Sequence, residues 1–290
     1  MKISTEISSS ARLVGEERAV ELIARAGFDA FDLSMCAMFK YDKESGGLID
    51  SDHPLRSADY LKFARRLKQI GLDNGIVCNQ SHAPFPVKYA PVRDCLKRAL
   101  ECTAEAGGDI CVIHPNNDKS AEENAEMYAE LLPFARGCGV RMATENMWNK
   151  NKETGEILPA ACSSPKSFVD HIRAVNDPYL VACVDIGHTE MKGVDTSAVE
   201  MLRALGPFVQ ALHIHDNDKI HDSHQIPFSM AIDFAPIAAA LREIDYQGYF
   251  TLECNNYLKA FDAERTEEGL FDLAQAARKF ADMVSNPSCS

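Results

Sequence analysis

The chain has 290 residues, of which 46% are hydrophobic and 25% are charged. Its 16 glycines and 13 prolines exclude collagen-like, low-complexity and wholly disordered chains. Lys and Arg number 30 against 43 Asp and Glu, which gives a formal net charge of −13. A chain this acidic repels a phosphate backbone unless its cations gather locally, so the composition disfavours nucleic-acid binding.

The amino-terminal sequence and the cysteines indicate a cytoplasmic protein. No basic segment followed by an apolar run of about 7–15 residues is visible, and no run approaches the roughly 18 apolar residues of a membrane span. We therefore expect no membrane partner. The 10 cysteines include no Cys-x-x-Cys pair and are expected to stay reduced.

Short apolar runs typical of strands alternate with longer amphipathic segments typical of helices. In chain order, we expect strand 3–8, helix 16–26, strand 30–33, helix 58–70, strand 75–79, helix 91–106, strand 109–113, helix 121–136, strand 140–144, helix 165–175, strand 180–184, helix 196–205, strand 209–214, helix 234–244, strand 249–252 and helix 263–284. Long loops are expected over 35–56, 146–164 and 216–233.

Eight such units predict a single closed (β/α)8 TIM barrel of the α/β class that spans residues 1–290. An open doubly wound sheet is the alternative. It is disfavoured because no Gly-x-Gly-x-x-Gly follows the first strand and no phosphate-binding P-loop occurs. No linker or break in composition divides the chain.

Six consecutive predicted strands end at or next to a His, Asp or Glu, where a barrel of this kind carries its catalytic residues. These residues are His82, His114, Glu145, Asp185, His213 and Glu253. A closed barrel brings them to one mouth, where carboxylates repel each other unless a cation neutralises them. Mixed imidazole and carboxylate ligands suit Zn²⁺ or Mn²⁺ and also admit Fe²⁺, Co²⁺ or Ni²⁺, whereas Mg²⁺ prefers oxygen ligands.

Two local spacings add ligand-type residues to this set. Asp185 and His188 lie three residues apart after a strand, where both side chains can reach the same side. Asp222 and His224 lie in the long loop after the seventh strand. That loop is read equally well as a solvated polar excursion, and we assign its other histidine, His221, to that role.

The motifs at these positions resemble those of the xylose isomerase-like TIM-barrel superfamily. The resemblance rests on Ser81-His82-Ala83-Pro84, His114-Pro115, Glu145-Asn146, Asp185-Ile186-Gly187-His188, His213-Ile214-His215-Asp216-Asn217-Asp218 and Glu253. It covers almost the whole chain. This superfamily includes sugar-phosphate isomerases and epimerases, ketose 3-epimerases and the endonuclease IV branch.

The epimerase and isomerase branches imply one divalent metal ion held by a Glu, an Asp, a His and a final Glu. By motif these ligands look like Glu145, Asp185, His213 and Glu253. We prefer His213 because the family's ligand is commonly followed by an acid three residues on, and Asp216 fits that spacing. His215 with Asp218 is the competing register, and both histidines can face the mouth since residues two apart on a strand share a face.

The endonuclease IV branch holds three zinc ions with further ligands, so the resemblance admits one to three ions per chain. The matching positions are similar to His82, His114, His188, Asp222 and His224. A multi-zinc phosphodiesterase is therefore the alternative function. Against it, the sequence has no cluster of Arg and aromatic residues that would wedge into a kinked duplex.

The resemblance implies a metal-dependent isomerase or epimerase of a small carbohydrate, a sugar or a sugar phosphate, which acts by proton abstraction next to a carbonyl. The metal lowers the cost of the enediolate, while Glu145 and Glu253 remove and return the proton. His188 is expected to bind a substrate oxygen. His82 and Trp148 are further substrate-binding candidates, as is Lys219, which stands where the epimerase branch often has an Arg.

A third reading is a binding protein or subunit that keeps the barrel without turnover. Glu145 and Glu253 argue against it, because binding alone does not need two acids beside a cation. The sequence leaves open whether the chain forms a homo-oligomer or works with a partner chain.

Overall fold

The barrel strands lie parallel in one sheet in the computed structural model, which describes residues 1–36 and 39–286. The order is β10-β1-β2-β3-β4-β5-β8-β9. Backbone hydrogen bonds from Ile214 to Thr251 and from Glu253 to Ile214 join β9 to β10 and complete the circle. The strands are β1 (Ile3–Glu6), β2 (Ala30–Ser34), β3 (Val77–His82), β4 (Ile110–Val112), β5 (Arg141–Glu145), β8 (Leu180–Asp185), β9 (Val209–His213) and β10 (Phe250–Leu252).

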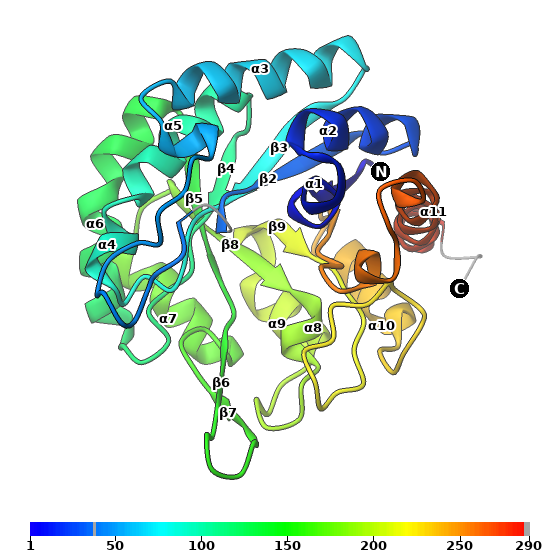
Figure 1. Ribbon diagram of the computed structural model, residues 1–290. Coiled ribbons are helices and arrows are strands. Elements are labelled where there is room, and N and C mark those ends of the chain that lie inside the picture. Colours follow the sequence, from blue (N-terminus) through cyan, green and yellow to red (C-terminus); the bar gives the residue numbers. More distant parts are fainter. Residues whose placement is uncertain (37–38, 287–290) are drawn as a thin grey trace.

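Helices surround the strands and make the protein a single (β/α)8 barrel (Figure 1). They are α1 (Ser8–Val14), α2 (Glu16–Arg25), α3 (Tyr60–Asp73), α4 (Ala90–Arg93), α5 (Leu96–Ala106), α6 (Ala121–Cys138), α7 (Pro165–Val175), α8 (Ile186–Thr189), α9 (Ala198–Leu205), α10 (Phe234–Glu243) and α11 (Thr266–Ser285). Short 3₁₀ turns lie at Pro54–Arg56, Gly206–Phe208 and Tyr257–Ala260. The eight predicted strands and the closed barrel are thus confirmed.

The first unit differs from the expectation of a strand over 3–8. Strand β1 stops at Glu6, and helix α1 begins at Ser8. The reason is local, because the Glu6 carboxylate accepts hydrogen bonds from the Ser8 hydroxyl at 2.5 Å and from the Ser9 backbone N–H at 3.1 Å. A carboxylate that satisfies N–H groups at a helix start stabilises the turn into the helix.

Two other expectations need correction. The helix expected over 91–106 is divided into α4 and α5, which are separated at Asp94 and Cys95. The loop expected over 146–164 contains an antiparallel hairpin, β6 (Trp148–Lys150) paired with β7 (Ile157–Pro159). In Figure 1 this hairpin extends outward from the barrel.

The barrel interior is apolar on one side and polar on the other. Small aliphatic side chains and one thiol form the apolar side: Ile110, Val112, Ala143, Val181, Cys183 and Ala211. On the polar side, Ser4 donates to Asn79 at 2.6 Å, and Gln80 donates to the Asp32 carboxylate at 2.9 Å. Because buried polar groups need partners, this network holds Asp32 in one position beneath the barrel mouth.

The helices and the cysteines of the described residues bear on membrane insertion and on disulfide bonding. Among the helices of the described residues, none has both the length and the apolar character of a membrane span. Nine cysteines lie in the described ranges, and all of them are free thiols.

Two phenylalanines of α11 provide a matched test of the packing between helix and barrel. Phe280 is fully buried and packs against Phe234 and Phe250, whereas Phe271 is 53% exposed. We expect Phe280→Ala to lower the free energy of unfolding by about 3–5 kcal/mol, because it leaves a cavity. Phe271→Ala should change it by about 0.5 kcal/mol or less. Urea unfolding followed by circular dichroism measures both, and equal losses would contradict this packing.

Candidate functional site

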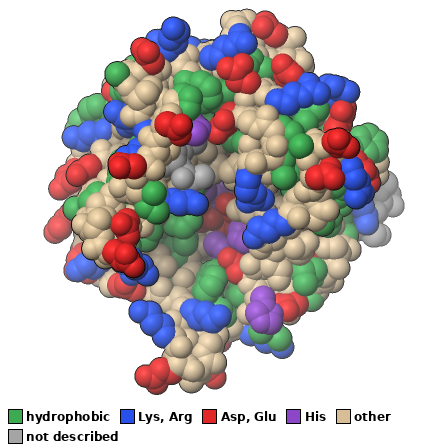
Figure 2. All heavy atoms as spheres, viewed as in Figure 1, with side chains coloured by type: hydrophobic (Ala, Val, Ile, Leu, Met, Phe, Trp, Pro, Cys, Tyr) green, Lys and Arg blue, Asp and Glu red, His purple; other side chains and the backbone are tan. Residues whose placement is uncertain are grey.

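The carboxyl ends of the strands gather ionisable side chains around one mouth of the barrel. The six strand-end residues expected from the sequence lie there: His82, His114, Glu145, Asp185, His213 and Glu253. A cavity of about 290 Å³ opens above them. Figure 2 shows histidine and acidic side chains at the floor of a hollow in this face.

Among the described residues, five groups of side chains place potential metal-ligand atoms within 4.8 Å of one another, and three of them together contain every His, Asp and Glu involved. The inner group consists of Glu145, Asp185, His213 and Glu253. The outer group consists of His188, His215, Asp222 and His224, and the third consists of His82, His114 and Glu145. Glu145 belongs to both the inner and the third group, as a carboxylate that bridges two metal positions would.

Several buried polar atoms at this mouth make no hydrogen bond within the described residues. They are Glu145 Oε2, Asp185 Oδ2, His114 Nε2, His215 Nε2, Asp222 Oδ1, Asp32 Oδ1 and Asn255 Oδ1. Each unpaired buried group costs about 1–3 kcal/mol. Unpaired carboxylate oxygens that face unpaired imidazole nitrogens fit a divalent cation, because a cation satisfies both kinds of atom.

His213 lies between two carboxylates. Its Nδ1 is 3.0 Å from Glu145 Oε1, and its Nε2 is 3.4 Å from Asp32 Oδ2. Both ring nitrogens therefore already have protein partners. Asp32 was missed by the sequence analysis, although a carboxylate in the apolar run Ala30-Phe31-Asp32-Leu33 was a visible signal.

His215 turns one ring nitrogen toward two carboxylates of the same mouth. Its Nε2 lies 3.2 Å from Asp185 Oδ1 and 3.6 Å from Asp222 Oδ1. The ring lies so close to Gly187 that a Cβ there would be 2.0 Å from His215 Cε1. Gly187 is therefore required for this position of the imidazole.

The acids used to choose between the two histidines have other roles. Asp216 accepts hydrogen bonds from the backbone N–H groups of Asn217, Met230 and Ile232 and so anchors the loop. Asp218 is bound to His221, which is an exposed residue. The spacing from histidine to acid therefore does not discriminate between His213 and His215.

The long loop after β9 contributes to the mouth and is not a purely solvated excursion. Asp222 Oδ2 lies 3.3 Å from His188 Nε2 and 3.2 Å from His224 Nε2. Paired backbone hydrogen bonds of 2.8 and 3.0 Å between Asp216 and Gln225 hold the loop over the barrel. His221 points to solvent, as expected.

The two glutamates of the inner group ionise differently. Burial, reinforced by the charges of Glu145 and Asp185, raises the pKa of Glu253 to about 7. Burial opposes the ionisation of Glu145 too, but the imidazoles of His213 and His114 hold its pKa well below the usual range. Two carboxylates with pKa values displaced in opposite directions are typical of an acid and base pair.

The pKa values of two imidazoles at the mouth are also displaced in opposite directions. Burial, together with the charge of His114, lowers the pKa of His82 to about 3. For His224, burial favours the neutral ring, but the Asp222 carboxylate and the charge of Glu253 raise its pKa to about 9. His82 is therefore neutral in the metal-free protein at neutral pH, and His224 holds a proton.

The expected substrate-binding residues divide into two sets. His82, His188 and Trp148 line the cavity, and the Trp148 ring lies 6.4 Å from the His188 ring. Lys219 lies outside the set that lines it, since its amine donates to Glu190 at 3.0 Å. Cys36, which the sequence analysis did not single out, also lines the cavity, with Sγ 3.0 Å from His82 Nδ1.

Comparisons with known proteins agree with this architecture. An uncharacterised protein of Methanocaldococcus jannaschii is 25% identical over 172 residues, which are 56% of this chain and 56% of that protein, so the match spans about half of the relative's length. A D-tagatose 3-epimerase-like protein has a TM-score of 0.70 at 20% identity, covering 99% of this chain and 100% of its own. The zinc-bound IolI protein has a TM-score of 0.71 at 17% identity, covering 98% of each chain.

A family model covers most of the barrel. It is described as a xylose isomerase-like TIM barrel and matches residues 20–278, from helix α2 to helix α11. This range includes every strand-end residue of the candidate site. The chain therefore belongs to the xylose isomerase-like TIM barrel family.

Proposed function

We propose that this protein is a metal-dependent isomerase or epimerase of a sugar or sugar phosphate. The observation that carries the proposal is the pairing of Glu145 with Glu253, whose donor atoms lie within 4.8 Å in a buried group of potential metal ligands. The structural similarity to a D-tagatose 3-epimerase-like protein and to an L-ribulose 3-epimerase supports a carbohydrate substrate.

The metal ligands in this proposal are Glu145, Asp185, Glu253 and one imidazole. His215 is favoured as the imidazole because its Nε2 faces the proposed ligand Asp185 at 3.2 Å, whereas the two nitrogens of His213 are divided between Glu145 and Asp32. His213 then connects Asp32 to Glu145 and fixes the orientation of that ligand. The ion is Zn²⁺ or Mn²⁺, and the remaining groups leave room for up to three ions.

The reaction in this proposal is a proton transfer next to a carbonyl. A bound divalent ion polarises the carbonyl oxygen and makes the adjacent C–H more acidic. In the absence of a metal ion, the pKa of Glu145 is held low and that of Glu253 is raised to about 7. The two carboxylates therefore differ in proton affinity, and one can accept a proton while the other returns one. In this proposal His188, whose Nε2 lies 3.3 Å from Asp222, exchanges that contact for a substrate oxygen, and Trp148 and His82 complete the wall of the cavity.

Hydrogen exchange tests the reaction directly. In D₂O, the zinc- or manganese-loaded protein is expected to incorporate deuterium next to the carbonyl of at least one ketose or ketose phosphate, as measured by NMR. Glu145→Gln and Glu253→Gln should each slow exchange by about 10²–10⁴-fold, because each removes a group that transfers the proton.

The matched control is Glu153→Gln, which changes an exposed glutamate of the hairpin between β6 and β7. It should exchange at the wild-type rate. If no ketose incorporates deuterium with the loaded protein, the proposed reaction is wrong.

Two histidine variants distinguish the competing registers. We expect His215→Gln to weaken metal binding by more than about 100-fold, because it removes a ligand. His213→Gln should weaken binding by about 10–100-fold, because it removes an outer contact. Competition with a chelator measures both affinities. The opposite order would assign the ligand to His213.

Metal affinity should depend on pH in a defined direction. An ion bound by the inner group must displace the proton of Glu253, whose pKa is about 7, and an ion bound by the outer group must displace that of His224, whose pKa is about 9. Affinity therefore rises with pH, by about tenfold per pH unit for each displaced proton, and more steeply below about pH 7 than above it.

Calorimetry in buffers of different ionisation enthalpy counts the released protons. His224→Gln should remove one of them, and His221→Gln, which changes an exposed histidine, should not. Affinity that is constant from about pH 6 to pH 8 would contradict displacement of these protons.

A multi-zinc phosphodiesterase is a second candidate, favoured by the outer and third ligand groups. About three tightly bound ions per chain in elemental analysis, with cleavage of an abasic DNA strand, would support it. About one tightly bound ion, with deuterium exchange into a ketose, supports the isomerase or epimerase.

A further inference from the structure

A second cavity, of about 250 Å³, adjoins the cavity of the metal centre. The two cavities share Phe85, His114 and Met147 in their walls, so these side chains form the partition between them. The second cavity is built from the loops that follow β3 and β4 and from the beginning of the β6–β7 hairpin. A ligand that occupied both cavities would therefore extend from the metal centre to the hairpin.

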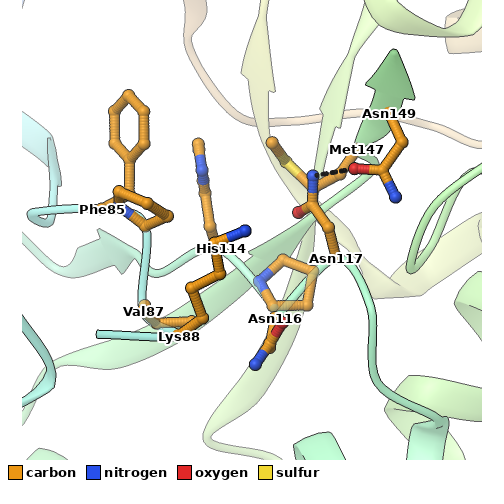
Figure 3. Close-up of a pocket in the computed structure, with 10 residues that line it drawn as sticks. Phe85, Val87, Lys88, His114, Asn116, Asn117, Met147 and Asn149 are labelled. Carbon is orange, nitrogen blue, oxygen red and sulfur yellow. Dashed lines mark hydrogen bonds between the residues drawn. The ribbon is translucent and has the colours of Figure 1, made fainter. Parts of the chain in front are cut away.

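The walls of the second cavity differ in chemistry. Figure 3 shows the Phe85 ring on one side and the Asn117–Asn149 pair on the other, with His114 between them. Phe85 is 43% exposed, and its ring centroid lies 4.6 Å from that of His114. An exposed aromatic face opposite carboxamides matches a ligand with an apolar face and several hydroxyl groups.

The carboxamide wall is ordered by its own hydrogen bonds. Asn117 Nδ2 donates to Asn149 Oδ1 at 3.2 Å and to the Trp148 backbone oxygen at 3.1 Å. Asn149 Nδ2 in turn donates to Asp118 at 3.2 Å. Asn117 uses only its amide nitrogen here, so its Oδ1 is left to accept from a ligand hydroxyl.

The charge of the lining disfavours a phosphate group. Lys88 is the only Lys or Arg among the residues that line the cavity, and its Nζ already lies 3.7 Å from an Asp118 carboxylate oxygen. A phosphate monoester carries a charge of about −1.5 to −2 and is bound by several charge-assisted hydrogen bonds. Amides both donate and accept, as hydroxyls do, so the lining fits a neutral polyhydroxylated group better.

We propose that the second cavity binds a glycosyl group attached to the sugar that reacts at the metal centre, so that the substrate is a glycosylated keto sugar. This inference rests on the proposed epimerase or isomerase function. Each cavity is slightly smaller than the roughly 300 Å³ at which small-molecule sites begin, so one sugar ring in each fits better than two in one. Phe85 packs on the second ring, and Asn117 and Asn149 bind its hydroxyls.

Deuterium exchange tests the substrate class. The metal-loaded protein is offered D-fructose, D-fructose 6-phosphate and glucosyl-fructose disaccharides linked through O4, O5 or O6, all of which have a potentially free carbonyl. We expect kcat/KM for one disaccharide to exceed that for D-fructose by about tenfold or more, which corresponds to about 1.4 kcal/mol. Asn149→Ala should lower this ratio by about tenfold, because it removes a hydrogen-bonding side chain from the second cavity and none from the cavity of the metal centre.

The control is Lys150→Ala, which changes an exposed residue of the same strand and should leave the ratio at its wild-type value. If D-fructose exchanges and no disaccharide is preferred, the inference is overturned and the proposed function stands. Preference for the phosphate, lost in Lys88→Ala, overturns the inference in favour of an anion site.

Binding provides a readout that needs no turnover. Trp148 is the only tryptophan of the chain, and its backbone oxygen accepts from Asn117. A reduced glucosyl-fructose disaccharide should change its fluorescence, with an affinity at least about tenfold weaker in Asn149→Ala. Equal affinities in wild type and variant would overturn the inference even if no ketose exchanges.

Discussion

The constraint on which the mouth of this barrel depends is the burial of several carboxylates in one place. Glu145, Asp185 and Asp32 have almost no exposed surface, and Asp222 approaches them from a loop. Carboxylates this close cannot all remain ionised without compensation. The surrounding imidazoles compensate part of the charge, and the oxygens and nitrogens between them could hold a cation that completes it.

The rest of the barrel supports this arrangement. The polar side of the interior holds Asp32 through Gln80, and Asp32 in turn faces His213, which faces Glu145. Gly187 leaves the space that the His215 ring occupies. A chain of contacts from the interior to the mouth thus fixes the orientation of the side chains that could hold an ion, and such preorganisation lowers the cost of binding.

The fold and the substrate preference have different structural origins. Members of a barrel family share the strands, whereas the loops that follow them differ and carry specificity. Here the β6–β7 hairpin supplies Trp148 to the cavity of the metal centre and Asn149 to the second cavity. The loop after β3 supplies Phe85 to both. Two loops therefore contribute side chains to both cavities, so under the proposed function they would join the reaction to recognition of the distal part of the substrate.

Local patterns in the chain were enough to predict the eight strands, the closed barrel and a mouth lined by His82, Glu145 and Asp185. Each of these predictions uses only the hydrophobic periodicity of a short segment and the residue that follows it. They did not predict the capping of α1 by Glu6, the hairpin at Trp148 or the contact of Asp32 with His213. These features depend on which side chains face each other across the barrel or the turn, and such contacts join positions as distant as 32 and 213. The same reason explains why spacing could not choose between His213 and His215, whose difference lies in the partners around each ring nitrogen.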